Sequence, residues 1–155
     1  MSLKTGPGDA GTDAAPHSLH CYTDGASRGN PGPSAYAYIL VDGEGRTIRQ
    51  DSGYLGEGTN NSAEYHAVIE SLKAALRYTQ GRIVVLSDSE LVVRQITGRY
   101  RIKKIHLADL SREVQKAASH FECVEFRNVP RDHPIIARAD TLCNRVLDMH
   151  TGKKS

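Results

Sequence analysis

The sequence has no tryptophan, only two phenylalanines and only three cysteines among its 155 residues. Cys21, Cys123 and Cys143 lie too far apart for a Cys-x-x-Cys metal motif. Their odd number and lack of regular spacing also argue against a disulfide framework. We therefore interpret them as small buried thiols in a reducing compartment, and we expect a cytoplasmic location.

Long apolar segments are missing as well. No run approaches the about 20 apolar residues that a membrane-spanning helix needs, which argues against a membrane role. The first seventeen residues lack the apolar core of a secretion signal. A net charge of +2 indicates no strong field toward nucleic acid. We expect a flexible N-terminal tail over 1–17, one domain over 18–150 and a flexible C-terminal tail over 151–155.

Five short segments have the apolar patterns of strands. The first three are separated by turn-forming residues at 25–34 and at 42–45, which predicts an antiparallel meander. The fourth is a continuous apolar run, as expected for a strand that is buried on both faces. The predicted strands are 19–23, 35–41, 46–55, 83–86 and 124–126.

Four segments show apolar residues at helical spacing. The first follows the meander, and Asn61 with Glu64 three residues later resembles a capping box. Gly81 ends this pattern, and the other helices are expected near 91–96, 107–117 and 136–147. The order βββ-α-β-α-α-β-α predicts an α/β domain with a mixed sheet flanked by helices.

Four acidic residues occur where strands or helices should deliver side chains to one place. Asp24 follows the first strand, Glu64 lies in the first helical turn, Asp88 follows the fourth strand, and Asp140 lies in the last helix. Two carboxylates about 4 Å apart repel by about 4 kcal/mol at an effective dielectric near 20. A cluster of this kind indicates a divalent cation site, and ligands that are all oxygen favour magnesium or manganese.

Topology supports convergence of these acids. Sites in α/β sheets form outside the carboxyl ends of central strands, where Asp88 lies, and the first strand should pack beside the fourth. Asp140 is four residues after Ile136 and three before Cys143, inside the apolar stripe of its helix. A charge that faces a core is costly unless it is paired or bound to a metal.

Each acid taken alone has a simpler interpretation, whereas all four together would require four coincidences. The alternatives are a turn residue for Asp24, completion of a capping box for Glu64, a helix cap for Asp88, and an ion pair with Arg138 or Arg145 for Asp140.

The segments around these acids resemble the motifs of the type 1 ribonuclease H family. They are YTDGASRGNPGP at 22–33, TNNSAEY at 59–65, LSDSELV at 86–92 and VPRDHPIIARAD at 129–140. The motifs occur in the family's order, and the resemblance extends from about His17 to His150. It implies a ribonuclease H-like fold with a five-stranded mixed sheet, in which two parallel strands follow the antiparallel meander.

The resemblance also implies an activity, namely endonucleolytic cleavage of the RNA strand of RNA/DNA hybrids. Two Mg²⁺ or Mn²⁺ ions would be held by Asp24, Glu64, Asp88 and Asp140. One ion would generate hydroxide and the other would stabilise the departing 3′ oxygen, leaving a 5′-phosphate and a 3′-hydroxyl. No obligate protein partner is implied, and we expect a monomer.

Substrate contacts follow from the same resemblance. The glycine-containing loop after the first strand can approach a sugar closely, and the 2′-hydroxyl is the group that distinguishes RNA. Turn formation is the alternative for Ser27 and Asn30, and helix capping is the alternative for Asn60 and Asn61. The implied hybrid contacts are Gly25, Ser27, Asn30, Asn60, Asn61 and Ser89, with Thr59 on a DNA phosphate.

The loop before Asp140 holds a histidine, as relatives in this family often do. His133 is the candidate for proton transfer or product release, because an imidazole titrates near neutral pH. Its spacing from Asp140 is shorter than in the best-known pattern, and Ile136 stands where an asparagine is common. Arg131 is the second candidate for this role, and an exposed loop histidine is the alternative interpretation of His133.

Some relatives carry a basic protrusion with tryptophans that grips the DNA strand, and this chain has only a short basic segment at 98–105. It is either a reduced substitute or a solvated connector. A hybrid-binding module without catalysis and another nuclease of the same superfamily remain the alternative functions. The candidate phosphate contacts of the segment are Arg99, Arg101, Lys103 and Lys104.

Overall fold

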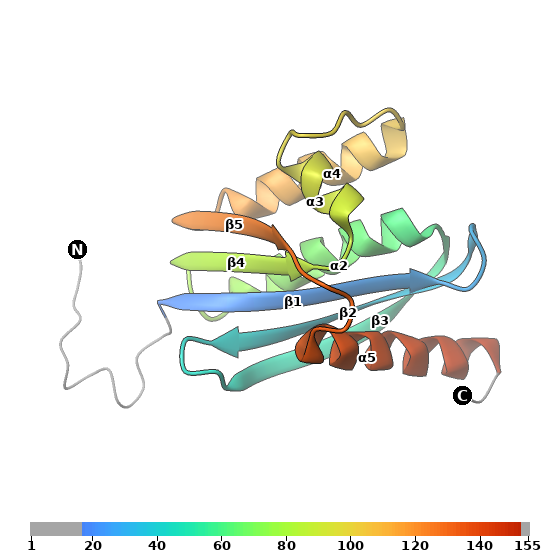
Figure 1. Cartoon of the computed structure of the whole chain (residues 1–155), viewed down its shortest axis with the longest axis horizontal. Coiled ribbons are helices and arrows are strands. Elements are labelled where there is room, and N and C mark those ends of the chain that lie inside the picture. Colours follow the sequence, from blue (N-terminus) through green and yellow to red (C-terminus); the bar gives the residue numbers. More distant parts are fainter. Residues whose placement is uncertain (1–16, 153–155) are drawn as a thin grey trace.

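The structure, a computed structural model, describes residues 17–152. A five-stranded sheet runs through it in the order β3-β2-β1-β4-β5 (Figure 1). The first three strands pair antiparallel, whereas β4 pairs parallel to both β1 and β5. This confirms the predicted fold class. The strands are β1 Ser18–Ser27, β2 Gly32–Asp42, β3 Thr47–Gly58, β4 Arg82–Ser87 and β5 Cys123–Asn128.

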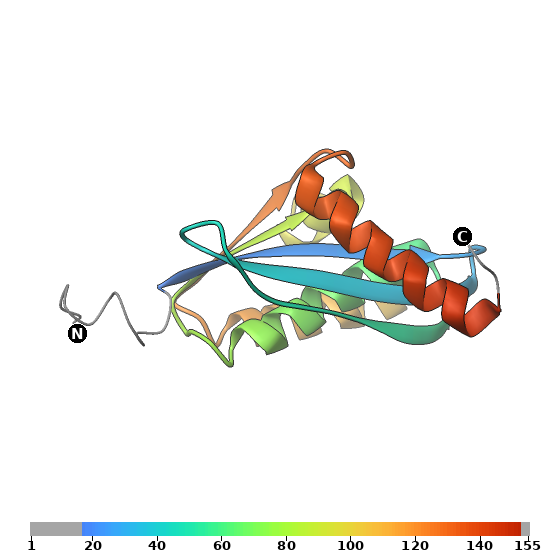
Figure 2. The same cartoon turned by 90° about the horizontal axis from the view of Figure 1, so that it is seen from below.

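Helices cover both faces of the sheet (Figure 2). One apolar cluster packs α2, α3 and α4 against one face, and a second cluster packs α5 against the other. In the part of the chain described, no helix is long and apolar enough to span a membrane. The helices are α2 Asn60–Ala75, α3 Glu90–Ile96, α4 Ile105–Ala118 and α5 Pro134–Thr151.

The first strand is longer than the sequence pattern predicts. β1 continues to Ser27 because residues 25–27 pair with residues 34–36 of β2, so only residues 28–31 connect the two strands. Asp24 therefore lies within β1, three residues before its end, and not at the close of the strand. Pairing with a neighbouring strand outweighs the turn preference of Gly25 and Ser27 here.

The helix caps also differ from the prediction. Thr59 is the N-cap of α2: its Oγ1 accepts from the main-chain N–H of Ser62 at 3.1 Å, and its own N–H donates to Ser62 Oγ at 3.0 Å. This capping box replaces the predicted box of Asn61 and Glu64, which was wrong. The cap leaves Glu64 free to point toward the sheet.

At the start of α3, Ser89 is the N-cap, and its Oγ accepts from Val92 N–H at 3.2 Å. Asp88 therefore does not cap α3. The parallel pairing of β1 with β4 places Thr23 opposite Ser87, so Asp24 and Asp88 follow at adjacent positions of neighbouring strands. The register of this pair brings the two acids to the same place.

The last helix runs almost to the end of the described residues. α5 extends to Thr151, one residue into the predicted C-terminal tail, and Gly152 ends it in the left-handed conformation with φ of 74°. A glycine at this position is the usual way to close a helix. The remainder of the two predicted tails, 1–16 and 153–155, lies outside the described residues.

Candidate functional site

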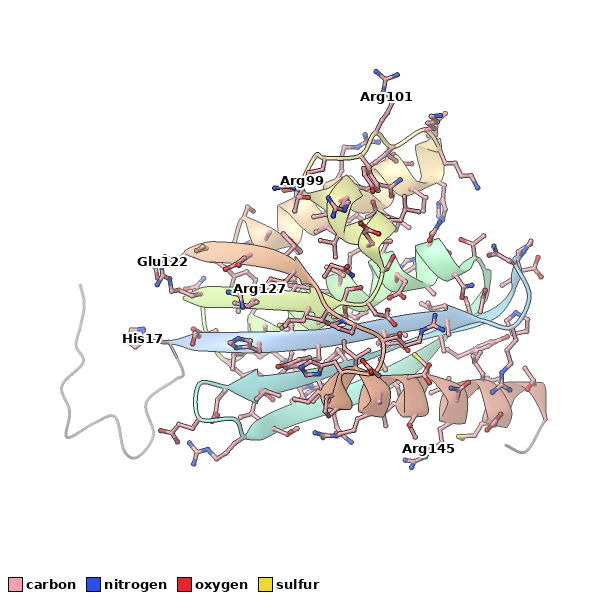
Figure 3. All side chains as sticks on the ribbon, in the orientation of Figure 1. His17, Arg99, Arg101, Glu122, Arg127 and Arg145 are labelled. Atoms are coloured by element: carbon pink, nitrogen blue, oxygen red, sulfur yellow. The ribbon has the colours of Figure 1, made fainter. Side chains whose placement is uncertain are left out.

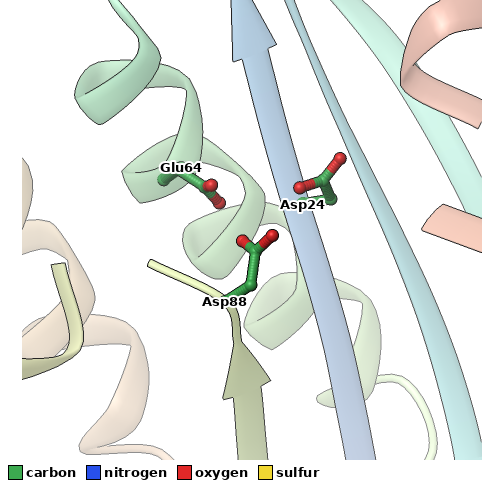
Figure 4. Close-up of side chains that lie close together, drawn as sticks. All are labelled: Asp24, Glu64 and Asp88. Carbon is green, nitrogen blue, oxygen red and sulfur yellow. The ribbon is translucent and has the colours of Figure 1, made fainter. Parts of the chain in front are cut away.

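Three carboxylates from three elements point toward a common spot (Figure 4). Asp24 comes from β1, Glu64 from the second turn of α2, and Asp88 from the residue after β4. One oxygen from each lies within 4.8 Å of the others. Asp24 and Glu64 are buried and Asp88 is partly exposed. The structure thus brings together three of the four acids that the sequence singled out.

Gly25 allows α2 to approach β1 closely enough for this arrangement. Its main-chain N–H donates to Glu64 Oε1 at 3.1 Å. A Cβ atom at this position would lie 2.3 Å from the carbonyl carbon of Ala63 and 2.5 Å from the nitrogen of Glu64. Any other residue would therefore collide with the helix backbone. Glycine is required here for close approach, and the contact fixes Glu64 beside Asp24.

Burial and neighbouring charges raise the pKa of two of these carboxyl groups, Asp24 and Glu64. Burial raises the pKa of Asp24 to about 8, with further contributions from the charges of Asp88 and Asp140. Burial also raises the pKa of Glu64 well above its usual range, and the charges of Asp24 and Asp88 add to the effect. The hydrogen bond from Gly25 N–H acts in the opposite direction, because it stabilises the charged form of Glu64.

The cluster has little compensating charge of its own. Within residues 17–152, the only ion pair to these three acids is from Arg131 Nε to Asp88 Oδ2 at 3.5 Å, and the Arg131 side chain is 92% exposed. Asp24 Oδ2 is buried and has no hydrogen-bond partner in the same residues. Unpartnered carboxylate oxygens in a group of three fit a hard divalent cation such as Mg²⁺.

Asp140 occupies a different position from the one predicted. The buried residues of α5 are Ile136, Ala139, Cys143 and Leu147, and Asp140 is exposed beside this stripe. The prediction that it faces the core was therefore wrong. Its charge nevertheless acts on Asp24, so it lies at the rim of the cluster.

Asp140 forms no ion pair with an arginine of its own helix. Arg138 instead donates to Gln50 Oε1 at 3.1 Å, and within residues 17–152 Asp140 has no salt bridge to Arg145. The partner of Asp140 is Asn144, whose Nδ2 lies 3.3 Å from Asp140 Oδ2. The ion-pair alternative for Asp140 is thus not observed.

His133 begins α5. It is the N-cap of the helix, and its Nδ1 accepts from Ile135 N–H at 3.1 Å. Its ring packs against Tyr22 with centroids 5.1 Å apart. Tyr22 and Asp24 are two residues apart on β1, so they share a face of the sheet. His133 is therefore not a freely exposed loop residue, and its Nδ1 is occupied as a hydrogen-bond acceptor.

The loop after β1 is fixed to the start of α2. The main-chain N–H of Ser27 donates to Asn60 Oδ1 at 2.9 Å, and Asn60 N–H donates to Asn30 Oδ1 at 3.1 Å. The side-chain oxygens of Asn30 and Asn60 are thus used within the protein. No hydrogen bond of their amide nitrogens is found in residues 17–152, which leaves two donors at this surface.

The side chains of four predicted substrate residues, Thr59, Ser89, Asn61 and Ser27, differ in their contacts and exposure. Thr59 and Ser89 use their hydroxyl oxygens as helix caps, as described above. Asn61 follows in the first turn of α2 and is partly exposed. Ser27 Oγ is buried and unpartnered within the described part of the chain.

The basic segment lies between α3 and α4. Arg99 and Arg101 are exposed, and Arg101 points away from the rest of the molecule (Figure 3). Lys103 and Lys104 are exposed as well, and Lys104 is the N-cap residue of α4 without a side-chain cap bond. The structure brings none of the four into an ion pair with the three clustered acids within residues 17–152.

Comparison with known proteins assigns the family. A sequence profile described as reverse transcriptase-like matches residues 22–146, which is most of the chain. The chain belongs to the ribonuclease H family. Ribonuclease HI of Halobacterium salinarum is 38% identical over 130 residues, covering 84% of this chain and 64% of the relative. The bifunctional protein Rv2228c of Mycobacterium tuberculosis is 37% identical over 126 residues, covering 81% of this chain.

The chain spans slightly under two thirds of the Halobacterium relative and 34% of the Mycobacterium one. Solved ribonuclease H structures match it over nearly their whole length. The crystal structure of RNase H1 from Halobacterium salinarum has a TM-score of 0.82 at 37% identity and covers 85% of this chain and 98% of its own. LC11-RNase H1 in complex with an RNA/DNA hybrid has a TM-score of 0.81 at 34% identity and covers 86% and 99%.

Two residues of this ribonuclease H domain contact the site region although no sequence pattern indicated them. Asn144 lies one helical turn after Asp140 and bonds to it, a relation that the spacing of four residues could have suggested. Arg28 donates to Asn144 Oδ1 at 3.2 Å from the loop after β1. That contact joins residues 116 positions apart, so only the fold reveals it.

We expect Gly25→Ala to destabilise the protein by about 1–3 kcal/mol, because the new methyl group has to push α2 away from β1. The displacement would also move Glu64 from Asp24, so the rise in melting temperature on adding Mg²⁺ should shrink. Urea unfolding and thermal melts with and without Mg²⁺ measure the two effects.

Gly43→Ala is the matched control, since Gly43 has no positive φ and a Cβ there would meet only Ser18 Oγ at 3.8 Å. If both variants were equally stable and responded equally to Mg²⁺, the close contact would not govern the site.

Proposed function

We propose that this protein is a metal-dependent endoribonuclease that hydrolyses the RNA strand of RNA/DNA hybrids. The observation that carries the proposal is the group of three carboxylates within 4.8 Å, one of which has a buried oxygen without a partner in the described residues. Membership of the ribonuclease H family supports it, and so does the likeness to a ribonuclease H1 solved with an RNA/DNA hybrid.

Asp24, Glu64 and Asp88, with Asp140 at the rim, would hold two divalent cations, Mg²⁺ or Mn²⁺. When bound, such cations would lower the pKa of water and stabilise the leaving 3′ oxygen in an in-line displacement, which would leave a 5′-phosphate and a 3′-hydroxyl. The protein itself supplies the placement of the ligands. Gly25 N–H orients Glu64, and the register of β1 and β4 sets Asp24 beside Asp88.

Selection of the RNA strand would depend on the loop after β1 and the start of α2. The hydrogen bonds from Asn60 N–H to Asn30 Oδ1 and from Ser27 N–H to Asn60 Oδ1 hold these two segments together, and the two amide nitrogens would serve as donors. Such donors can bond to a 2′-hydroxyl, which DNA lacks. Gly25, Ser27, Asn61 and Ser89 would make further contacts to the hybrid, and Thr59 would lie near a phosphate of the DNA strand.

From the sequence, His133, or Arg131 in its place, is the candidate for proton transfer or product release. We propose that the two residues share these tasks. Arg131 lies beside Asp88 and is exposed enough to move, so its charge can assist a phosphate entering or leaving the site. His133 holds the start of the helix that carries Asp140, and its Nε2 has no hydrogen bond within residues 17–152. Proton transfer through Nε2 stays a proposal.

A binding module without catalysis is disfavoured by the charge of the site. Phosphates are repelled by clustered carboxylates, so binding alone gains nothing from Asp24, Glu64 and Asp88. The exposed basic segment with Arg99, Arg101, Lys103 and Lys104 would suffice for phosphate contacts.

The direct test is cleavage of labelled duplexes. With Mg²⁺ or Mn²⁺ we expect the RNA strand of an RNA/DNA hybrid to be cut internally, while a DNA duplex of the same sequence stays intact. Analysis of the product ends should give 5′-phosphates. Equal cutting of both duplexes would favour another nuclease of the superfamily, and tight binding with no cleavage under any divalent metal would favour a binding module.

Asp24→Asn should abolish cleavage while leaving stability in EDTA unchanged or higher, because the substitution removes a buried carboxyl whose ionisation next to Asp88 and Glu64 is unfavourable. The Mg²⁺-induced rise in melting temperature should also be lost. Asp109→Asn is the control, since Asp109 is an exposed residue of α4 paired with Arg112 and such surface pairs contribute little. A large loss of stability in EDTA would show that Asp24 has a structural partner instead.

His133 can be tested with two substitutions. Asparagine is a good N-cap, whereas alanine is not, and losing a cap costs about 1 kcal/mol. If the imidazole transfers protons, His133→Ala and His133→Asn should both slow turnover without eliminating it, but only alanine should lower stability. Normal turnover in His133→Asn would show that His133 serves only as a cap.

A further inference from the structure

One side chain joins the loop after β1 to the far end of α5. Arg28 follows the last residue of β1, and its Nη2 forms an ion pair with Asp148 Oδ1 at 2.7 Å. Nη1 lies 3.4 Å from Thr151 Oγ1, near the negatively polarised end of the helix. The side chains of Arg28 and Asp148 are only 28% and 15% exposed. This is a partly buried, charge-assisted contact, and solvent screens it less than a surface pair.

The same guanidinium group is connected to Asp140. Its Nη2 donates to Asn144 Oδ1 at 3.2 Å, and Asn144 Nδ2 donates to Asp140 Oδ2 at 3.3 Å and to the main-chain oxygen of Asp140 at 3.1 Å. Both contacts require the same orientation of the Asn144 amide, with the oxygen toward Arg28 and the nitrogen toward Asp140. A continuous chain of hydrogen bonds therefore runs from Arg28 to Asp140.

Asp140 depends on such support more than the other acids do. Asp24, Glu64 and Asp88 are held by the sheet and by the packing of α2 on it, whereas Asp140 is exposed on a separate helix. Asp140, Asn144 and Asp148 are four residues apart and form one row along α5. Arg28 contacts the second and third members of this row.

The backbone of Arg28 lies between two residues, Ser27 and Asn30, that bond to the start of α2. Ser27 N–H donates to Asn60 on one side of it, and Asn30 accepts from Asn60 on the other. A movement of the loop would therefore move Arg28, and with it Asn144. The loop at 28–31 and the Asp140 carboxylate at the rim of the cluster are therefore connected through Arg28 and Asn144.

We infer that Arg28 and Asn144 are positioning residues, which couple the loop at 28–31 to the placement of Asp140. This inference rests on the proposed function, because it assigns Asp140 a role in holding cations. Without either residue, the Asp140 carboxylate is no longer held in its orientation toward the cluster. The affinity of the site for Mg²⁺ falls, and the loop loses its tie to α5.

Four variants test the coupling: Asn144→Ala, Arg28→Ala, the double variant, and Arg28→Lys. Arg145→Ala is the matched control, because Arg145 is an exposed arginine next to Asn144 that points away from the sheet (Figure 3). Four quantities are measured, namely the Mg²⁺ concentration for half-maximal cleavage, kcat and KM for the hybrid, and the Mg²⁺-induced shift in melting temperature without substrate.

Asn144→Ala should raise the half-maximal Mg²⁺ concentration by about ten-fold, as expected for partners that orient metal ligands. Its KM for the hybrid should change little. Arg28→Ala should raise both the Mg²⁺ requirement and KM, since it also frees the loop. Arg28→Lys keeps the positive charge near Asp148, but the lysine side chain is shorter and lacks the planar guanidinium whose Nη2 contacts both Asp148 and Asn144. This variant should therefore keep the stability and lose the Mg²⁺ affinity.

The double variant decides whether the two residues act together. Its Mg²⁺ requirement should lie within about two-fold of that of Arg28→Ala, because contacts in one network are not additive. Independent effects that multiply would overturn the coupling, as would an unchanged Mg²⁺ requirement in Asn144→Ala. Lower stability with unchanged Mg²⁺ dependence would mean that the contacts serve only the fold.

Failure of the proposed function would look different. If the wild-type protein cleaves no hybrid with any divalent metal, the proposed activity is wrong. The melting-temperature shifts would still report on the contacts of Arg28, Asn144 and Asp140. If the wild type cleaves and is stabilised by Mg²⁺ while all variants match it, the activity stands and the positioning role of Arg28 and Asn144 is wrong.

Discussion

The backbone contact between Gly25 and α2 is the constraint on which the site depends. The missing Cβ lets the carbonyl of Ala63 and the nitrogen of Glu64 come against β1, and the N–H of Gly25 then meets the Glu64 carboxylate. Moving α2 outward by one methyl group would separate Glu64 from Asp24. The packing of α2, α3 and α4 on this face is thus arranged around a contact that only glycine permits.

The charges of the site oppose the packing that assembles it. Burial and mutual repulsion raise the pKa of Asp24 and of Glu64, so without a cation the ionised cluster destabilises the fold. The two apolar layers on either side of the sheet stabilise the structure enough to hold the acids in place. Arg131 offsets part of the negative charge of Asp88. Because the Arg131 side chain is exposed, a divalent cation could displace it from Asp88.

Much of this arrangement could be predicted from the sequence, because it depends on strand order and register. The buried run ending at Asp88 and the motif around Asp24 mark neighbouring strand positions, and Glu64 follows in the next helix along the chain. The fold class followed from the same patterns. Cap positions could not be predicted in this way, because Thr59, Asn60 and Asn61 all have side chains able to cap a helix. Ser62 decided the outcome by completing the box with Thr59.

The predicted burial of Asp140 was wrong for a related reason. A position between Ile136 and Cys143 fits the apolar stripe by spacing, but the stripe is carried by Ile136, Ala139, Cys143 and Leu147, and Asp140 lies beside it. Whether a residue at the margin of a stripe is buried depends on how the helix is rotated against the sheet. That rotation is set by tertiary contacts, such as those of His133 with Tyr22 at one end of α5 and Arg28 with Asp148 at the other.

The four acids that we propose as cation ligands divide into a rigid group and an adjustable one. Asp24, Glu64 and Asp88 belong to β1, α2 and the end of β4, which pack into one body through the Gly25 contact and the parallel register. Asp140 belongs to α5, which reaches that body through a smaller apolar cluster and through polar contacts at its two ends. In the proposed function, this design would keep three cation ligands together in the fold, while the loop at 28–31 would influence Asp140 on the rim through Arg28.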